Sequence, residues 1–206
     1  MRTTLLAVAL FSTSALAGAA PGLTFLGRPI GDGSEDAAAR ELVTLGERIA
    51  QPLAVPRTRD RDAFMKWLDG AYRARLDRDE RDRNTLADLA ERIGAKHEPL
   101  ITVVLAHVLD AQWRQAETAN AADPLAKVSA SGGIGIDDGA RRAAPVARAA
   151  RNCAKQAAGK PGLAAWAIEC ARLATEYERR IDTRCAQARA LGLAQPGTFC
   201  GDRAAK

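Results

Sequence analysis

The stretch "CAKQAAGKPGLAAWAIEC", residues 153–170, decides the fold, because it places two cysteines on either side of a Gly-Lys-Pro-Gly turn. Glycine commonly ends helices and proline commonly begins them, so this turn separates two helical segments. In an antiparallel pair of helices, facing residues lie symmetrically about the turn, and Cys153 and Cys170 are centred on it. We therefore predict a helical hairpin that is closed by a disulfide between these two cysteines.

The other two cysteines follow the same rule. Cys185 and Cys200 are centred on Gly192, the expected end of the second helix. Cys170 and Cys185 would lie about 22 Å apart on one helix, whereas a disulfide needs about 5.5 Å between Cα atoms. The predicted pairs are thus Cys153 with Cys170 and Cys185 with Cys200. The alternative is the crossed pairing of residue 153 with 185 and residue 170 with 200.

Proline and glycine also place the ends of the hairpin helices. Pro145 is the expected start of the first helix and Gly159 its end, while Pro161 begins a second helix that continues to about Leu191. We predict that residues 141–206 form an antiparallel, disulfide-stapled helical hairpin with a short C-terminal return.

The composition favours helices in the rest of the chain as well. Alanine and arginine are abundant and aromatic residues make up only 4%, so helix formers dominate and strand formers are scarce. We predict an all-α fold in which residues 34–120 form a helical bundle of four helices. These helices are expected from a Ser34 cap to about Gln51, from Asp60 to the charged run "DRDERDRN" at 77–84, from Asn84 or Thr85 to Gly94, and from Pro99 onward.

Two pairs of segments within this region resemble each other. "LVTLGERIA" at 42–50 matches "LADLAERIG" at 86–94, and "WLDGAYR" at 67–73 matches "VLDAQWR" at 108–114. The spacing is close to the length of one helical hairpin, so duplication would make the bundle two stacked hairpins, but coincidence is the favoured explanation in a chain so rich in alanine, leucine and arginine.

The N-terminus has the pattern of a secretory signal peptide. A basic residue, Arg2, precedes an apolar run at 5–11, and the small residues Ala15 and Ala17 follow. We predict that residues 1–17 are a signal peptide and that the mature protein is periplasmic or secreted, with no transmembrane segment once that peptide is removed.

Two segments lack helical periodicity. Residues 18–33 are rich in glycine and proline and predict an extended leader over the surface. Residues 121–140 gain glycine and serine and predict a linker. Their "GGIGIDDG" stretch lacks the Gly-Lys-Ser/Thr ending of a phosphate-binding loop.

The sequence offers few groups for catalysis or metal binding. Bridging all four cysteines removes every thiol, and no C-x-x-C motif or nearby histidine suggests a metal site or a cofactor. His107 shares a helical stripe with Asp110 and Arg114, so a carboxylate could orient its ring, but no G-x-S-x-G nucleophile motif is present. We assign no catalytic residue.

Acidic residues leave one catalytic alternative open, a glycan-cleaving hydrolase that uses paired carboxylates. In the last third of the chain, however, acidic residues alternate with arginines, which favours ion pairs on helix faces. The acidic residues concerned are Glu169, Glu176, Glu178 and Asp182.

The charge is unevenly distributed. Residues 18–140 carry 16 Lys and Arg against 20 Asp and Glu, and residues 141–206 carry 13 against 5. Arg148, Arg151 and Lys155 lie at i, i+3 and i+7 with no acidic residue among them, and we call this set the basic ridge. It suits an anionic envelope component or an acidic protein surface, or else pairs with the acidic first half.

These observations predict an exported, non-catalytic binding, adaptor or inhibitor-like protein of the cell envelope. Nucleic acid is not the expected partner, because no aromatic residue interleaves with the basic ridge and the chain is predicted to be exported. The alternative is a hydrolase of envelope polymers that uses acidic residues.

Overall fold

The structure is a computed structural model that describes residues 22–123 and 134–204. It confirms the all-α class and the helical bundle, with a single two-stranded pairing in the described residues. The predicted signal peptide lies outside the described residues, as does part of the predicted linker. The elements are β1 (Thr24–Phe25), β2 (Arg28–Pro29), α1 (Ala37–Ala50), α2 (Arg61–Trp67), the π-helix η1 (Leu68–Tyr72), α3 (Arg73–Ile93), the 3-10 helix η2 (Gly94–Lys96), α4 (Glu98–Ala122), α6 (Ile134–Ala157), α7 (Ala164–Ala190) and α8 (Phe199–Ala204).

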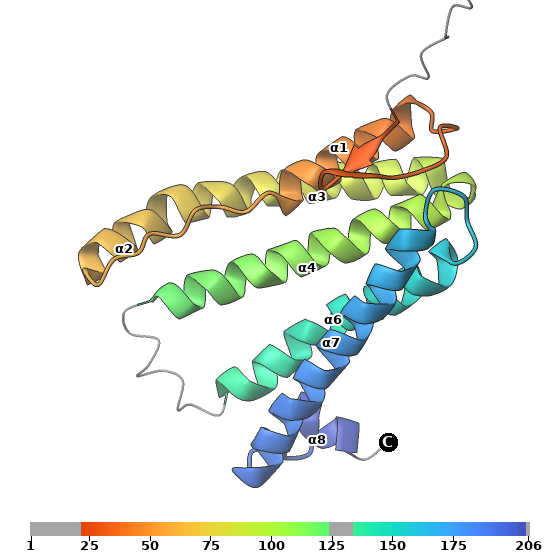
Figure 1. Ribbon diagram of the computed structural model, residues 1–206. Helices are drawn as coiled ribbons and strands as arrows, with labels where there is room; N and C mark the ends of the chain where they lie inside the picture. The colour runs from red at the N-terminus through yellow and green to blue at the C-terminus, as the bar shows by residue number, and fades with distance from the viewer. Residues whose placement is uncertain (1–21, 124–133, 205–206) are drawn as a thin grey trace, which may run out of the picture.

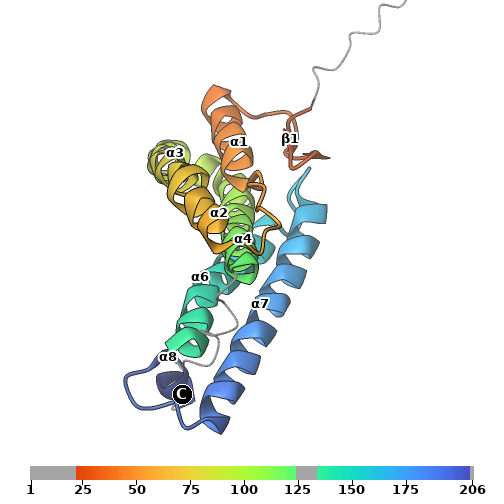
Figure 2. The same cartoon turned by 90° about the vertical axis from the view of Figure 1, so that its left-hand side faces the viewer.

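Helix α4 lies at the centre of the molecule (Figures 1 and 2). Helices α1 and α3 lie along one side of it, and α6 packs against the other side while pairing with α7. The short helix α8 packs at the far end of the α6–α7 pair. The chain therefore places a helical hairpin beside a helical bundle and joins the two through α4.

Both predicted disulfides are present. Cys153 and Cys170 join α6 to α7 with 5.9 Å between their Cα atoms, and Cys185 and Cys200 join α7 to α8 with 5.0 Å. The Gly-Lys-Pro-Gly turn has Gly159 and Gly162 in the left-handed region, at φ 68° each, as an abrupt reversal requires. The crossed pairing is wrong.

The charged run at 77–84 was predicted to end the second helix, but the helical structure continues through it. One helical segment continues from Arg61 to Ile93 through α2, η1 and α3. Two of its acidic residues are buried rather than solvated. Asp79 pairs with Arg75, 2.7 Å away, and Asp82 pairs with Arg48 of α1, also 2.7 Å away. These ion pairs allow a highly charged helix to pack against α1. The prediction of a separate third helix that begins at Asn84 or Thr85 is therefore wrong.

Helix α6 begins at Ile134, inside the predicted linker, so Pro145 lies within the helix and not at its start. Proline has no N–H, so Pro145 cannot donate to the carbonyl of Arg141, four residues earlier in the helix. Both residues are exposed, so water can reach this part of the helix. The first helix also differs, because Asp36 caps it through a 3.0 Å bond from the Ala39 N–H, whereas the Ser34 hydroxyl donates to Asp32.

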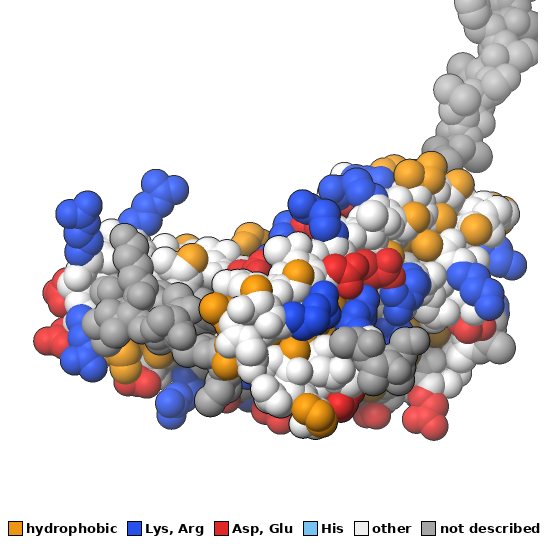
Figure 3. Space-filling model, turned by 90° about the horizontal axis from the view of Figure 1, so that it is seen from below, with side chains coloured by type: hydrophobic (Ala, Val, Ile, Leu, Met, Phe, Trp, Pro, Cys, Tyr) orange, Lys and Arg blue, Asp and Glu red, His pale blue; other side chains and the backbone are white. Residues whose placement is uncertain are grey.

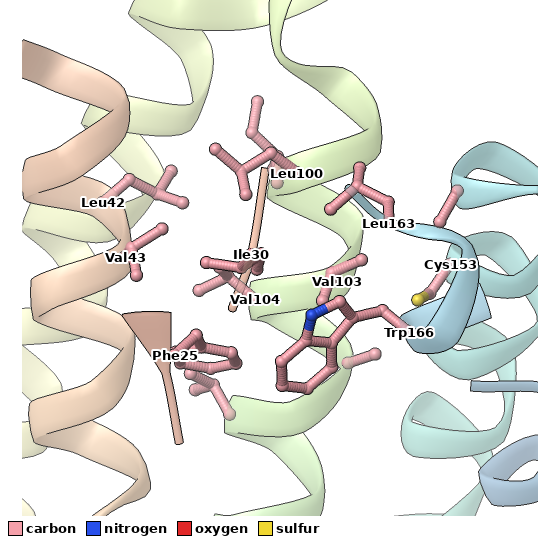
Figure 4. Close-up of a cluster of buried hydrophobic side chains, with 14 of the residues drawn as sticks. Phe25, Ile30, Leu42, Val43, Leu100, Val103, Val104, Cys153, Leu163 and Trp166 are labelled. Atoms are coloured by element: carbon pink, nitrogen blue, oxygen red, sulfur yellow. The ribbon is translucent and has the colours of Figure 1, made fainter. Parts of the chain in front are cut away.

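The leader is more than a surface segment. Its two strands form a hairpin that buries Phe25 and Ile30, with exposed fractions of 0% and 2%. The Trp166 indole N–H of α7 donates to the Pro29 carbonyl at 2.8 Å. Figure 4 shows these side chains converging with residues of α1, α4 and α6. One hydrophobic cluster thus contains residues from the leader, the bundle and the hairpin, and the buried residues of a second cluster come from α6, α7 and α8.

Candidate functional site

The basic ridge lies on the exposed side of α6. Arg148 and Lys155 are exposed, and no acidic residue of the described chain pairs with either. Arg151 pairs with Glu178 of α7. Preceding the ridge, Arg141 and Arg142 share a single carboxylate, that of Asp138. The ridge therefore keeps an excess of positive charge.

Helix α7 presents further basic residues that the sequence analysis assigned to ion pairs. Arg172 and Arg179 are exposed, and neither makes an ion pair within 4 Å among residues 22–123 and 134–204, although the charge of Arg172 acts on Glu176, four residues further along α7. They share a helix face with Ile168, at i, i+4 and i+11, and Ile168 is 74% exposed. Acidic residues lie three or four positions from both arginines in the sequence, so local spacing predicts ion pairs, and only the tertiary contacts of these acids show otherwise.

The α7 acids pair elsewhere. Glu169 pairs with Arg28 of the leader, and Asp182 pairs with Arg203 of α8 at 3.0 Å. Glu176 lies 3.4 Å from Arg114 of α4 and 2.8 Å from Arg180. Burial raises the pKa of the Glu176 carboxyl, but Arg114, Arg180 and Arg172 together outweigh this effect and the net pKa is lowered.

Ion pairs between α4 and α7 extend this network. Glu117 of α4 lies 2.6 Å from Arg180 and 3.3 Å from Arg184 of α7. The buried Tyr177 hydroxyl donates to Asp110 of α4 at 2.8 Å. Part of the positive charge of the hairpin is thus matched by the acidic first half, as one of the two predicted interpretations required.

The hairpin has one side against α4 and one side away from it. Gln156 of α6 donates to Glu98 of α4 at 3.2 Å, and Arg180 of α7 pairs with Glu117. At about 100° per residue, Arg151 is about 140° around α6 from Gln156, and Glu178 is about 160° around α7 from Arg180. Their ion pair therefore crosses the side that faces away from α4.

We call this side the outer face of the hairpin. It comprises Arg148, Arg151 and Lys155 of α6 and Glu178 of α7. Ile168, Arg172 and Arg179 lie about 160–180° around α7 from Cys170, which is joined to α6, so they point away from α6 and not toward this side. Seen from below (Figure 3), the molecule carries Lys and Arg side chains at several separate places, with acidic and hydrophobic side chains between them.

His107 is buried, and it does not form the histidine–carboxylate pair that the helical spacing would have allowed. Its Nδ1 lies 2.9 Å from the Val103 carbonyl, which can only accept, so Nδ1 carries the proton. Asp110 instead accepts hydrogen bonds from Arg114 and Tyr177. The nearest carboxylate oxygen to Nε2 belongs to Glu169, 3.8 Å away, beyond hydrogen-bond distance.

A groove of about 290 Å³ passes over this histidine. Leu26, Pro52 and Leu53 give it an apolar wall, and Asp110 and Arg114 give it a polar end. No hydroxyl nucleophile lines it apart from Thr118, whose hydroxyl donates to the Arg114 carbonyl. The groove has the shape of a small binding site and lacks an activated nucleophile.

The second histidine has a structural role. His97 Nε2 lies 3.1 Å from the Asp36 carboxylate, which also accepts from the Ala39 N–H and from Lys96. These bonds, the one from Ala39 first, hold the pKa of Asp36 below its usual range. The site fixes the start of α1 against the start of α4.

In the part of the chain that the structure describes, no group of three or more His, Cys, Asp or Glu side chains could hold a metal ion. No described helix combines the length and the apolar character that crossing a bilayer requires. Comparison of the chain with protein-family models, curated proteins and solved structures gives no significant match. Function must therefore be argued from the geometry alone.

Proposed function

We propose that this is an exported, non-catalytic binding protein of the cell envelope, periplasmic or secreted, whose outer face recognises an anionic envelope component or an acidic protein surface. Export is supported by the signal-peptide pattern and by the two disulfides, which are typical of chains that fold in an oxidising compartment.

The observation that carries the proposal is that the acidic residues of the hairpin are paired, whereas two of its exposed basic residues are not. The acidic residues Glu169, Glu176 and Asp182 are each paired with an arginine of another element. Arg148 and Lys155 remain exposed without an acidic partner in the described chain. Unpaired cations on one surface attract anions over roughly a Debye length, about 8 Å at physiological salt.

The hydrolase alternative has less support. A general acid requires a carboxyl whose pKa is raised. The described carboxyls with resolved shifts, those of Asp32, Asp36, Asp138 and Glu176, all have lowered pKa values.

The test is capture from native envelope extract with the disulfides intact, at increasing salt. We expect retention of a specific component that falls steeply as salt rises, and that is lost in the double variant Arg148→Ala with Lys155→Ala. The control, Arg81→Ala with Arg83→Ala, removes the same charge from exposed positions of α3. Retention that neither salt nor the double variant affects would contradict the proposal.

A further inference from the structure

We infer that the groove over His107 binds a small, neutral, mainly apolar molecule that carries a hydroxyl group. Three features of the groove point to such a ligand: a buried acceptor without a donor, a polar end whose charges cancel, and an apolar wall that includes a strained turn. No residue of the outer face of the hairpin lines this groove, so the inference goes beyond the proposed function.

The buried acceptor is Nε2 of His107. Because Nδ1 carries the proton that is donated to the Val103 carbonyl, Nε2 of the neutral ring has a lone pair and can only accept. It makes no hydrogen bond to any described residue, and the side chain is only 6% exposed. Buried polar atoms ordinarily have a partner. Since His107 lines the groove, a ligand hydroxyl bound there can donate to this nitrogen.

The polar end of the groove favours a neutral ligand. Asp110 and Arg114 form an ion pair with 2.8 Å between a carboxylate oxygen and Nε, and Arg114 also reaches Glu176. The two charges that line the groove are therefore matched within the protein, and a charged ligand would gain no unpaired counter-charge from them. The volume of about 290 Å³ is at the lower end of the range for small-molecule pockets, about 300–1,000 Å³, which indicates a small ligand.

Two features hold the apolar wall in place. The Gln115 side chain of α4 fixes the backbone of Leu53, because its Oε1 accepts from the Leu53 N–H at 2.8 Å and its Nε2 donates to the Leu53 carbonyl at 3.2 Å. Leu26 lies in the two-residue turn between β1 and β2 with φ 50°, in the left-handed region where Asn, Asp or Gly is usual. A leucine that is strained and still 40% exposed gains little from the core, and contact with an apolar ligand gives it a role.

The experiment is a titration of the full mature chain, isotope-labelled and with its disulfides intact, with para-propylphenol. Nuclear magnetic resonance follows the ring nitrogens of the two histidines, and we expect Nε2 of His107 to shift while His97 does not. Para-propylanisole, the methyl ether of the same phenol, cannot donate a hydrogen bond and should bind about 5–10-fold more weakly. A His107 signal that the phenol does not move, or equal binding of phenol and ether, would overturn the inference.

Two variants, with affinities measured by calorimetry, separate the acceptor from the wall. His107→Phe keeps a ring beside Phe25 and Trp166 but removes the acceptor, so the preference for phenol over ether should disappear. Leu26→Asn suits the turn and should leave the protein at least as stable, yet weaken phenol binding about fivefold. Its control, Leu191→Asn, removes another exposed leucine and should bind the phenol as the wild type does. Unchanged affinity in Leu26→Asn would contradict the inference even if His107→Phe did not fold.

Discussion

Tyr177 shows how one hydroxyl couples the hairpin to the bundle. The side chain is fully buried on α7, and its O–H donates to Asp110 of α4. Burial and the nearby carboxylate raise the pKa of this phenol well above its usual range, so the hydroxyl remains a donor at any physiological pH. The partner of this hydroxyl is 67 residues away in the sequence, so local spacing could not predict the bond.

The first prediction follows from this bond. Tyr177→Phe removes the donor and leaves the half-buried Asp110 with Arg114 alone, so the free energy of unfolding should fall by about 1.5 kcal/mol. Urea denaturation followed by circular dichroism measures the change. Tyr72→Phe is the control, because the Tyr72 hydroxyl makes no hydrogen bond to any described residue and should change little. Equal effects of the two substitutions would contradict the role of the bond.

A second prediction at the residue scale concerns pH. The folded-state pKa of Asp36 is lowered by the Ala39 N–H, His97 and Lys96. Its ionisation therefore stabilises the fold fully above the ordinary value of 3.8, and this contribution is lost as the pH falls below that value.

Asp36→Asn keeps a helix cap but does not titrate. The wild-type protein should be the more stable above about pH 5, and the difference should shrink as the pH falls toward 2. Thermal unfolding over this pH range measures it. A difference that stays constant with pH would show that the charge of Asp36 is not involved.

At the scale of helices, the approach of α1 to α4 depends on Gly46. A Cβ atom at this position would lie 2.3 Å from Cγ1 of Val104, so the two helices could not keep their distance. Gly46→Ala should lower the free energy of unfolding by about 1–3 kcal/mol. Gly70, in η1, has no heavy atom within 4 Å of such a Cβ. Gly70→Ala should therefore leave stability unchanged or raise it by up to about 1 kcal/mol. Guanidinium denaturation of both variants tests the contrast.

The same scale shows what local sequence patterns can predict. The cysteine spacing was sufficient to identify both disulfides, because helix geometry restricts which cysteines can meet. The starts of α3 and α6 were not predictable in this way, although glycine marked their ends correctly. The charged run at 77–84 continues as a helix because Arg48, distant in sequence, pairs with Asp82. Pro145 is tolerated because its turn faces solvent. In both cases tertiary position outweighs local propensity.

For the whole molecule, the sequence indicated that the charge is asymmetric, but it could not show which cations pair within the protein and which stay unpaired. Glu117 meets Arg180 and Arg184 across the α4–α7 interface, whereas Arg148 and Lys155 face away from it. The packing of α4 against the hairpin decides which cations of the hairpin find an acidic partner. The candidate site was therefore half predicted: the ridge on α6 was identified, and the ion pair of its Arg151 with Glu178 of α7 was missed.

The shared core determines how the whole molecule should unfold. Cys153 and Cys170 lie in the same hydrophobic cluster as Leu42 of α1, Val103 of α4 and Trp166 of α7. Because the disulfides close loops with sequence separations of 17 and 15, removal of either should cost about 3 kcal/mol. We expect Cys153→Ala with Cys170→Ala to lower the unfolding midpoint and to keep one transition.

Tryptophan fluorescence and far-ultraviolet circular dichroism should report that single transition together, since the hairpin cannot open without exposing the core of the bundle. The matched variant, Cys185→Ala with Cys200→Ala, frees only α8 at the far end of the hairpin and should leave the Trp166 signal unchanged before global unfolding. Two separate transitions in the first variant would mean that the hairpin is an independent domain, and the core shared through α4 would then not be what holds the two halves together.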